Sequence, residues 1–234
     1  MSNISEIALY GVSVPIVRTY AGTLLHTDVV KHAELPKGAK IIAANHPSTG
    51  DPFFVASMIH QRCFIMIENL LFQVPVLGTY LRRSGHISIQ HDNNQTAMDA
   101  ALKHLKAGHT VMIFPEGLIS PSDGGFNPVH TGVARLALAS GAPVIPVGIA
   151  IQRERIHHIP SIVRGEKQVG HWYLKGPYAM TVGRPLQFTG DPDDRELTRS
   201  VADQTMRRII EMATESELRL NRTLGAVSGI FDLI

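Results

Sequence analysis

Cysteine and charged side chains are scarce in this 234-residue chain, and each shortage removes a class of protein. The single cysteine, Cys63, excludes an internal disulfide framework and a zinc site built on several cysteines. Charged residues make up 18% of the chain, whereas soluble domains average about 25%. The 22 Lys and Arg residues almost balance the 20 Asp and Glu residues. A net charge of +2 excludes a dedicated nucleic-acid binder with a dense basic face.

A long apolar run is also missing. The longest one near the amino terminus extends from Ile7 to Val17, is bounded by Glu6 and Arg18, and is interrupted by Pro15. Crossing a bilayer takes about 20 apolar residues, so this run cannot span one. We expect residues 1–30 to form a helical segment. This segment either lies in a membrane interface or packs as a core helix, and its sequence alone leaves both readings open.

The first six residues lack the basic region that begins a secretory signal, so we expect no export. A reducing, cytosolic compartment fits the single cysteine. Hydrophobic residues nevertheless make up 44% of the chain, and its mean hydropathy is +0.05. This content excludes intrinsic disorder and suffices for a core without disulfides or metals.

Short β-branched runs alternate with helical patterns from about residue 40 onward. The strands are predicted at residues 41–45, 63–67, 86–89, 110–114, 144–149 and 179–182. One helix is predicted to begin near Asp51, and others at residues 96–106, 133–140 and 194–220. This alternation predicts an α/β fold, with a mostly parallel mixed sheet covered by helices and the helical segment at the amino terminus.

The sequence Asn45-His-Pro-Ser-Thr-Gly-Asp-Pro52 carries the strongest chemical signal. It follows a predicted strand, and open α/β sheets bind ligands in loops at the carboxyl ends of their strands. His46 can accept a proton near neutral pH, and Asp51 can orient its imidazole as in a catalytic triad. Two plainer readings remain: Asp51 as a helix cap before Pro52, and His46 as a partly buried loop histidine. Neither explains why both residues share one turn.

A second motif, Phe114-Pro-Glu-Gly117, also follows a predicted strand, and a third, Pro143-Val-Ile-Pro-Val147, lies in the strand at 144–149. The ordered set of three motifs resembles the glycerolipid acyltransferases, specifically the lysophosphatidate (1-acylglycerol-3-phosphate) acyltransferase group. The resemblance covers about residues 30–190, and we expect residues 31–234 to form the acyltransferase domain.

This resemblance implies transfer of a fatty acyl group from a thioester, carried by coenzyme A or acyl carrier protein, to a lipid hydroxyl. It implies His46 as the general base, oriented by Asp51, with no metal and no cofactor beyond the acyl donor. Glu116 and Gly117 are expected to help bind the acceptor, together with Ser48, His91 and His130. The expected partners are the donor, the lipid and a membrane surface. The expected location is cytoplasmic, peripheral at the inner face of the membrane.

Three positions depart from the family pattern. Ile119 stands where an arginine usually contacts the acceptor phosphate, and His91 and His130 replace two other usual cations. A charge-assisted hydrogen bond to phosphate is worth about 1.5–3 kcal/mol. We therefore expect weaker selection for a phosphomonoester head group than is usual in the family.

Two alternatives belong to other functional classes. The 12 histidines, among them His157 and His158, allow a metal-dependent hydrolase with Asp51 or Glu116, although no H-E-x-x-H pattern is present. A lipid-binding relative without turnover is the other alternative, and the intact His46 and Asp51 argue against it.

Overall fold

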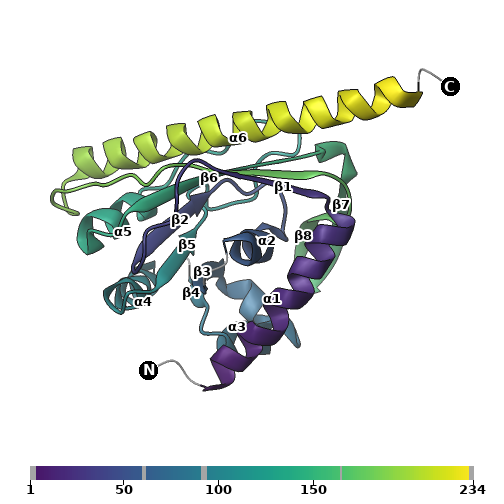
Figure 1. Ribbon diagram of the computed structural model, residues 1–234. Helices are drawn as coiled ribbons and strands as arrows, with labels where there is room; N and C mark the ends of the chain where they lie inside the picture. Colours follow the sequence, from purple (N-terminus) through teal and green to yellow (C-terminus); the bar gives the residue numbers. More distant parts are fainter. Residues whose placement is uncertain (1–3, 60–61, 91–93, 164, 232–234) are drawn as a thin grey trace.

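The computed structural model describes residues 4–59, 62–90, 94–163 and 165–231 (Figure 1). A seven-stranded sheet forms their centre, with the strand order β1-β9-β6-β2-β5-β3-β4. All neighbouring strands pair in parallel except β6 and β9, which are antiparallel. The strands are β1 (Thr27–Lys31), β2 (Lys40–Ala44), β3 (Cys63–Glu68), β4 (Ile87–Ile89), β5 (Thr110–Ile113), β6 (Val144–Ile151) and β9 (Tyr178–Val182). The predicted mixed, mostly parallel α/β sheet is confirmed.

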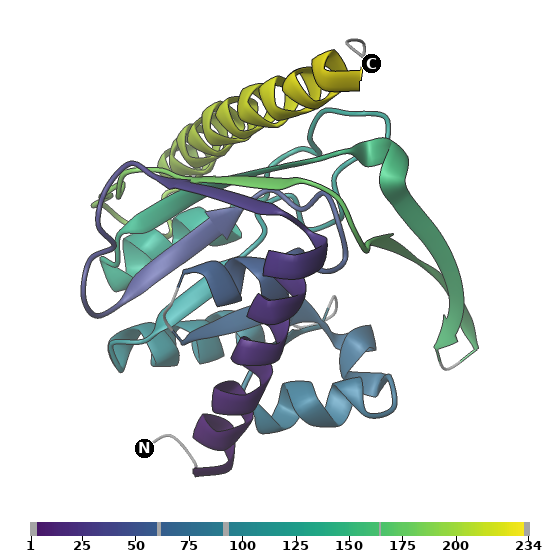
Figure 2. The same cartoon turned by 45° about the vertical axis from the view of Figure 1, so that its right-hand side comes forward.

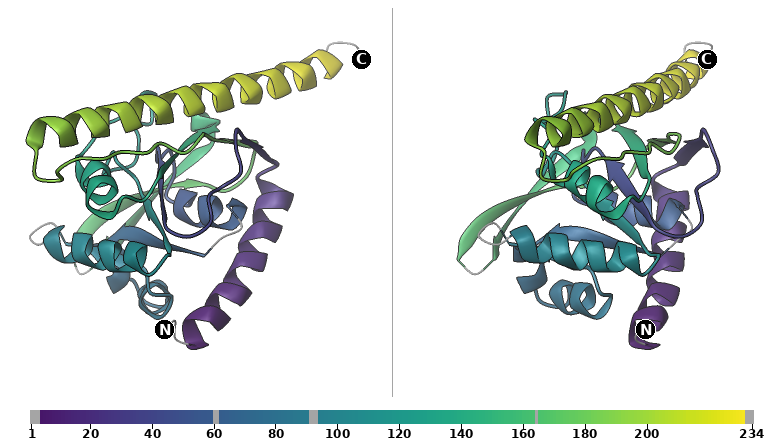
Figure 3. Two further views of the ribbon diagram at one scale, coloured as in Figure 1. Left: turned by 60° about the vertical axis from the view of Figure 1, so that its left-hand side comes forward. Right: turned by 90° about the vertical axis from the view of Figure 1, so that its left-hand side faces the viewer.

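Helices cover both faces of this sheet (Figures 1 and 3). One face packs against α1 (Ile4–Leu24), α2 (Asp51–Met58) and α3 (Leu77–Arg83). The other packs against α4 (Asn94–Lys106), α5 (Gly132–Ser140) and α6 (Arg195–Phe231). Successive side chains of a strand point to opposite faces, so Ile42 joins the first core whereas Ile41 joins the second. Two short 3₁₀ turns, η1 (Asn69–Gln73) and η2 (Arg153–Arg155), complete the helical elements of the described chain.

The long helix α6 lies directly against β6. A Cβ atom on Gly148 would fall 1.9 Å from the backbone nitrogen of Ala213, so only glycine allows this close approach. The helix continues to Phe231, beyond the predicted end at residue 220.

Three strands were not predicted. One is β1, which lies at the edge of the sheet, and residues 25–30, grouped by the sequence with the helical segment, contain most of it. The other two, β7 (Ile156–Val163) and β8 (Glu166–Tyr173), form an antiparallel hairpin as a separate two-stranded sheet. This hairpin projects away from the body of the molecule (Figures 2 and 3).

Helix α1 confirms the predicted helical segment and contains Pro15. Val17 and Tyr20 pack against the core, and the Arg18 Nε donates a hydrogen bond of 2.8 Å to the Ser57 carbonyl. The helix therefore contributes to the core, while Val12 and Ile16 remain exposed. Among the described residues, no helix is both long and apolar enough to cross a membrane.

Candidate active site

The loop that carries His46 begins at the carboxyl end of β2, where hydrogen bonds join β2 to β6. The buried Asn45 side chain donates to the Ile149 carbonyl (2.9 Å) and accepts from the Ile149 amide (2.7 Å). These two hydrogen bonds tie the carboxyl end of β2 to β6. His46 follows immediately, at the edge of the sheet where α/β folds place ligands.

Asp51 is fully buried and accepts four hydrogen bonds. Its Oδ2 accepts from the Ser48 amide (2.6 Å) and the His46 Nδ1 (3.2 Å). Its Oδ1 accepts from the hydroxyls of Ser48 (2.9 Å) and Tyr178 (3.0 Å). These donors offset the cost of burying the carboxylate away from water. Asp51 also opens α2 as its first residue, so the expected helix start and the contact with His46 coexist.

Asp51 leaves only one ring nitrogen of His46 open to chemistry. With Nδ1 held by Asp51, the Nε2 atom is the one that a substrate hydroxyl can approach. The imidazole is stacked on Phe114, with ring centroids 4.2 Å apart, and its side chain is 16% exposed. The ring is therefore fixed in orientation but still reachable from outside.

Glu116 is buried and organises the loops around His46. Its Oε1 accepts from the Ser120 hydroxyl (2.6 Å) and the His46 amide (3.2 Å). Its Oε2 accepts from the backbone and side-chain nitrogens of Asn127 (2.7 and 3.3 Å). The Ser120 amide in turn donates to the His46 carbonyl (2.8 Å). One carboxylate thus joins three segments of the chain.

The remaining expected site residues differ in their exposure. Gly117 is exposed with a φ of +69°, and the ring of the exposed His130 lies against it, 2.9 Å from the place of a Cβ. Ser48 is fully buried, with its hydroxyl on Asp51. Ile119 is half-buried and accepts a hydrogen bond from Asn127 through its carbonyl. His91 lies outside the described residues.

The β7–β8 hairpin joins the site at its base. The Thr49 amide donates to the His171 carbonyl (2.8 Å), and the His171 amide donates to the Thr49 hydroxyl (2.9 Å). The pKa of His171 is lowered by burial and by the positive charges of the neighbouring His158 and His46. The two hydrogen bonds therefore tie the hairpin to the loop that carries His46.

Three contributors to the site were not predicted: Tyr178, Ser120 and Asn127. Tyr178 begins β9, and burial, followed by the nearby Asp51, raises its pKa well above 10. It therefore remains a hydrogen-bond donor throughout the neutral range. No motif or spacing marks Tyr178, because only the pairing of β9 with β6 brings it to Asp51.

Comparison with known proteins identifies the family of the chain. A family model described as "Acyltransferase" matches residues 26–150. The chain belongs to the acyltransferase family. The match contains the His46–Asp51 loop and the segment around Glu116, whereas the β7–β8 hairpin and Tyr178 follow it.

Similar proteins carry one common description. The 1-acyl-sn-glycerol-3-phosphate acyltransferase of Saccharomyces cerevisiae is 30% identical over 131 residues, covering 54% of this chain and 43% of the yeast protein. The Escherichia coli protein of that name is 26% identical over 124 residues, covering 51% of this chain and 50% of its own length. This acyltransferase-family chain spans about half the length of the curated relatives it matches.

A solved structure supports the fold. The crystal structure of the 1-acyl-sn-glycerophosphate (LPA) acyltransferase PlsC from Thermotoga maritima matches with a TM-score of 0.61. The match has 23% identity and covers 85% of this chain and 78% of that one.

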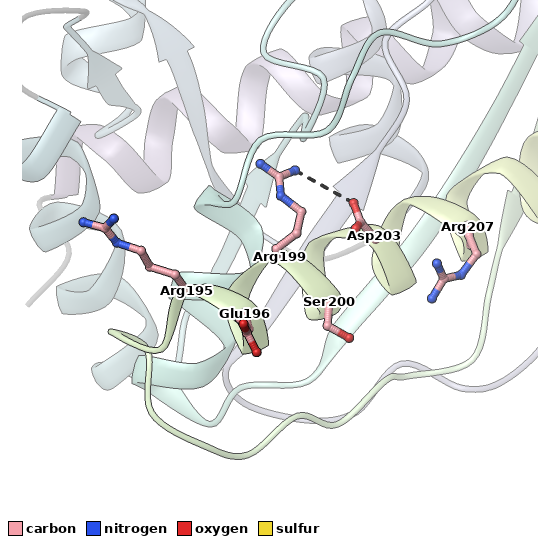
Figure 4. A pocket seen from close by; sticks show the side chains of 6 residues that line it. All are labelled: Arg195, Glu196, Arg199, Ser200, Asp203 and Arg207. Atoms are coloured by element: carbon pink, nitrogen blue, oxygen red, sulfur yellow. Dashed lines mark ion pairs between the residues drawn. The ribbon is translucent and has the colours of Figure 1, made fainter.

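Other candidate chemistry receives less support. Burial raises the pKa of Cys63 to about 12, which suits an inert thiol rather than a nucleophile. Within the described residues, no group of three His, Cys, Asp or Glu side chains could hold a metal ion. A shallow hollow along α6 contains an ion pair between Arg199 and Asp203 at 3.8 Å (Figure 4). All its lining residues come from that one helix: Arg195, Glu196, Arg199, Ser200, Asp203 and Arg207.

Proposed function

We propose that this chain transfers a fatty acyl group from an acyl thioester to the hydroxyl of a lysophosphatidate-like glycerolipid. The carrier of the acyl group is coenzyme A or acyl carrier protein. The observation that carries the proposal is the contact of His46 Nδ1 with the buried Asp51, which leaves Nε2 for the acceptor hydroxyl. The family membership and the description shared by the relatives support the same reaction.

His46 supplies the base that the reaction needs. An alcohol has a pKa far above 7, so its attack on a thioester requires a positioned proton acceptor. His46 Nε2 takes the hydroxyl proton as the acceptor oxygen bonds to the thioester carbonyl carbon. The carbon–sulfur bond then breaks, and the imidazolium returns the proton to the departing thiolate. Asp51 stabilises the imidazolium, and no covalent enzyme intermediate is required.

The loop around Glu116 binds the acceptor in this proposal. Gly117 and His130 provide its exposed surface. Glu116 and Ser48 support this surface indirectly by holding the loops in place. Their oxygens already form hydrogen bonds with Asn127, Ser120, His46 and Asp51. His91 is retained as a further acceptor contact on the basis of the sequence.

The proposal also covers which head group the acceptor carries. Ile119 offers an apolar side chain where the family pattern has a phosphate-binding arginine. We therefore expect a mild preference at most for lysophosphatidate over lysophospholipids with a phosphodiester head group. The measurement is kcat/KM for both acceptors with one acyl donor. A preference of about a hundredfold or more for lysophosphatidate, near 2.7 kcal/mol, would contradict this expectation.

The reaction itself is tested with purified protein. Thiol release from long-chain acyl-coenzyme A or acyl carrier protein is followed with and without lysophosphatidate, and lipid mass spectrometry identifies the product. We expect acceptor-dependent thiol release and a newly acylated lipid, both unaffected by a chelator. Chelator-sensitive hydrolysis would favour the metal-dependent hydrolase. If no thiol is released and no new lipid forms with any donor or acceptor, a lipid-binding relative without turnover is favoured.

A further inference from the structure

The β7–β8 hairpin exposes apolar side chains on an element with few neighbours. Its strands pair from Ile156 with Tyr173 to Val163 with Glu166, and among its described residues the hydrogen bonds to the body come from the part near its base. The hairpin extends freely from the sheet (Figure 2). An isolated two-stranded hairpin is marginally stable in water, so a partner surface for it is physically favourable.

The exposed apolar residues of the hairpin lie along its length. Ile162 is 71% exposed, Val169 is 52% exposed and Ile159 is 46% exposed. Residues directly opposite in an antiparallel pair share a face. The pairs His158–His171, Pro160–Val169 and Ile162–Lys167 therefore form one face that leads outward from the active site. The His158 and His171 rings confirm this sharing, with centroids 4.6 Å apart.

This face begins beside the catalytic pair and continues outward. His171 is hydrogen-bonded to Thr49 in the His46 loop. On the other side, Arg153 at the base of the hairpin donates a hydrogen bond to the carbonyl of Pro121. The loop leading to Pro121 exposes Leu118, a further apolar residue. Exposed apolar side chains thus occur on two segments that are hydrogen-bonded to the loop of His46 or to the base of the hairpin.

The hairpin together with the residues that flank its base is more basic than the rest of the chain. Residues 153–175 contain five Lys and Arg residues against two Glu residues, a formal charge of +3, of which the hairpin itself, residues 156–173, contributes +1. Because the whole chain carries +2, the remainder carries −1. A basic segment with exposed aliphatic side chains matches an anionic lipid surface, which attracts cations and accepts apolar groups. A purely apolar partner would not account for the charge.

We propose that the β7–β8 hairpin is the membrane-docking arm of this protein and binds the surface of an anionic bilayer. Ile162 and Val169 enter the interface between head groups and acyl chains, and Lys167 remains at head-group level. Docking through this arm brings the His46 site to the lipid surface. The inference depends on the proposed function for its purpose but not for its test, because vesicle binding is measured without acyl transfer.

The test is flotation of the purified full chain with vesicles of equal parts phosphatidylcholine and phosphatidylglycerol, and with pure phosphatidylcholine. The double variant I162S/V169S removes the aliphatic contact. We expect it to reduce the partition coefficient about tenfold or more, as loss of partly buried aliphatic side chains predicts. The matched control is Leu218→Ser, which removes an exposed leucine from α6 and should bind as wild type does. Unchanged binding of I162S/V169S would overturn the proposal.

A second variant tests the charge separately. Lys167→Glu leaves every aliphatic side chain in place, and we expect it to lose most of the preference for anionic over zwitterionic vesicles. An unchanged preference would contradict the docking arm. All three altered side chains of the hairpin are exposed, so thermal unfolding should match wild type.

Two further outcomes identify a different surface. If V12S/I16S on α1 abolishes flotation while I162S/V169S leaves it intact, α1 is the anchor and the hairpin proposal is wrong. If wild type is a dimer that I162S/V169S dissociates, and vesicle binding is unchanged, the hairpin pairs with a second copy instead. Size-exclusion chromatography with light scattering distinguishes this case.

Discussion

The Tyr178 hydroxyl donates a hydrogen bond of 3.0 Å to Asp51 Oδ1, the carboxylate whose other oxygen contacts His46. Tyr178 thereby reaches the His46–Asp51 pair from β9, more than a hundred residues along the chain. Both side chains are fully buried, so water cannot replace this contact. The donor holds the carboxylate in one orientation and, through it, the imidazole.

Tyr178→Phe should therefore slow acyl transfer without changing acceptor binding. We expect kcat to fall about tenfold, near 1.4 kcal/mol, as loss of a hydrogen bond to a charged group predicts. KM for the acceptor should remain unchanged. The matched control is Tyr173→Phe, whose hydroxyl donates to the Pro177 carbonyl instead. Equal effects of both variants on kcat would show a general packing defect.

Glu116→Gln should destabilise the loops around His46. An amide keeps one acceptor oxygen but turns its NH₂ group toward groups that are themselves donors on Ser120, His46 or Asn127. We expect a loss of about 1–3 kcal/mol in the free energy of unfolding, together with reduced kcat. Denaturant titration measures the first quantity. Glu211→Gln, which alters an exposed pair with Arg208, should change stability little. An increase in acceptor KM with unchanged stability would instead indicate direct acceptor binding by Glu116.

Acid should destabilise the fold through His86. Burial, and then the positive charges of Arg62 and His104, lowers the pKa of His86 to about 4 in the native state. In the unfolded chain, this imidazole takes up a proton below its ordinary pKa of about 6.5. Neutral His86 therefore stabilises the native state fully above pH 6.5. This contribution, about 3 kcal/mol, is lost as pH falls toward 4.

The comparison is with His86→Asn, whose amide oxygen can still accept the hydrogen bond that the Ile65 amide donates to His86 Nδ1. Urea unfolding at several pH values should show a shallower acid dependence for the variant between pH 6.5 and 4. Parallel curves for the two proteins would show that His86 does not titrate as described.

The fold was predictable from the sequence where a strand is buried along its whole length. Strands such as β2 and β5 are buried along their whole length, and their continuous apolar runs revealed them. The strands β1, β7 and β8 were missed because they mix polar and apolar residues, and their conformation depends on pairing. His157 and His158, considered as metal ligands in the sequence, lie in β7, and among the described residues they belong to no group of three side chains that could hold a metal ion.

The site was predictable only where one loop contains it. His46 and Asp51 share a single turn, so their contact follows from local chain geometry. Tyr178 reaches Asp51 through the pairing of β9 with β6, which no short motif encodes. The motif containing Glu116 was visible, but its contacts with Asn127 depend on how the intervening loop folds back.

The most direct test of the account is the rate of acyl transfer by purified His46→Ala, measured by thiol release and product mass spectrometry. His46 is a loop residue whose side chain still reaches the surface, so we expect near-native thermal unfolding and a kcat reduced about 10²–10⁴-fold. The control, His32→Ala, removes a histidine that pairs with Glu215 at 2.9 Å and should retain wild-type turnover. A folded His46→Ala protein that keeps most of the wild-type rate would contradict the assignment of His46 as the general base.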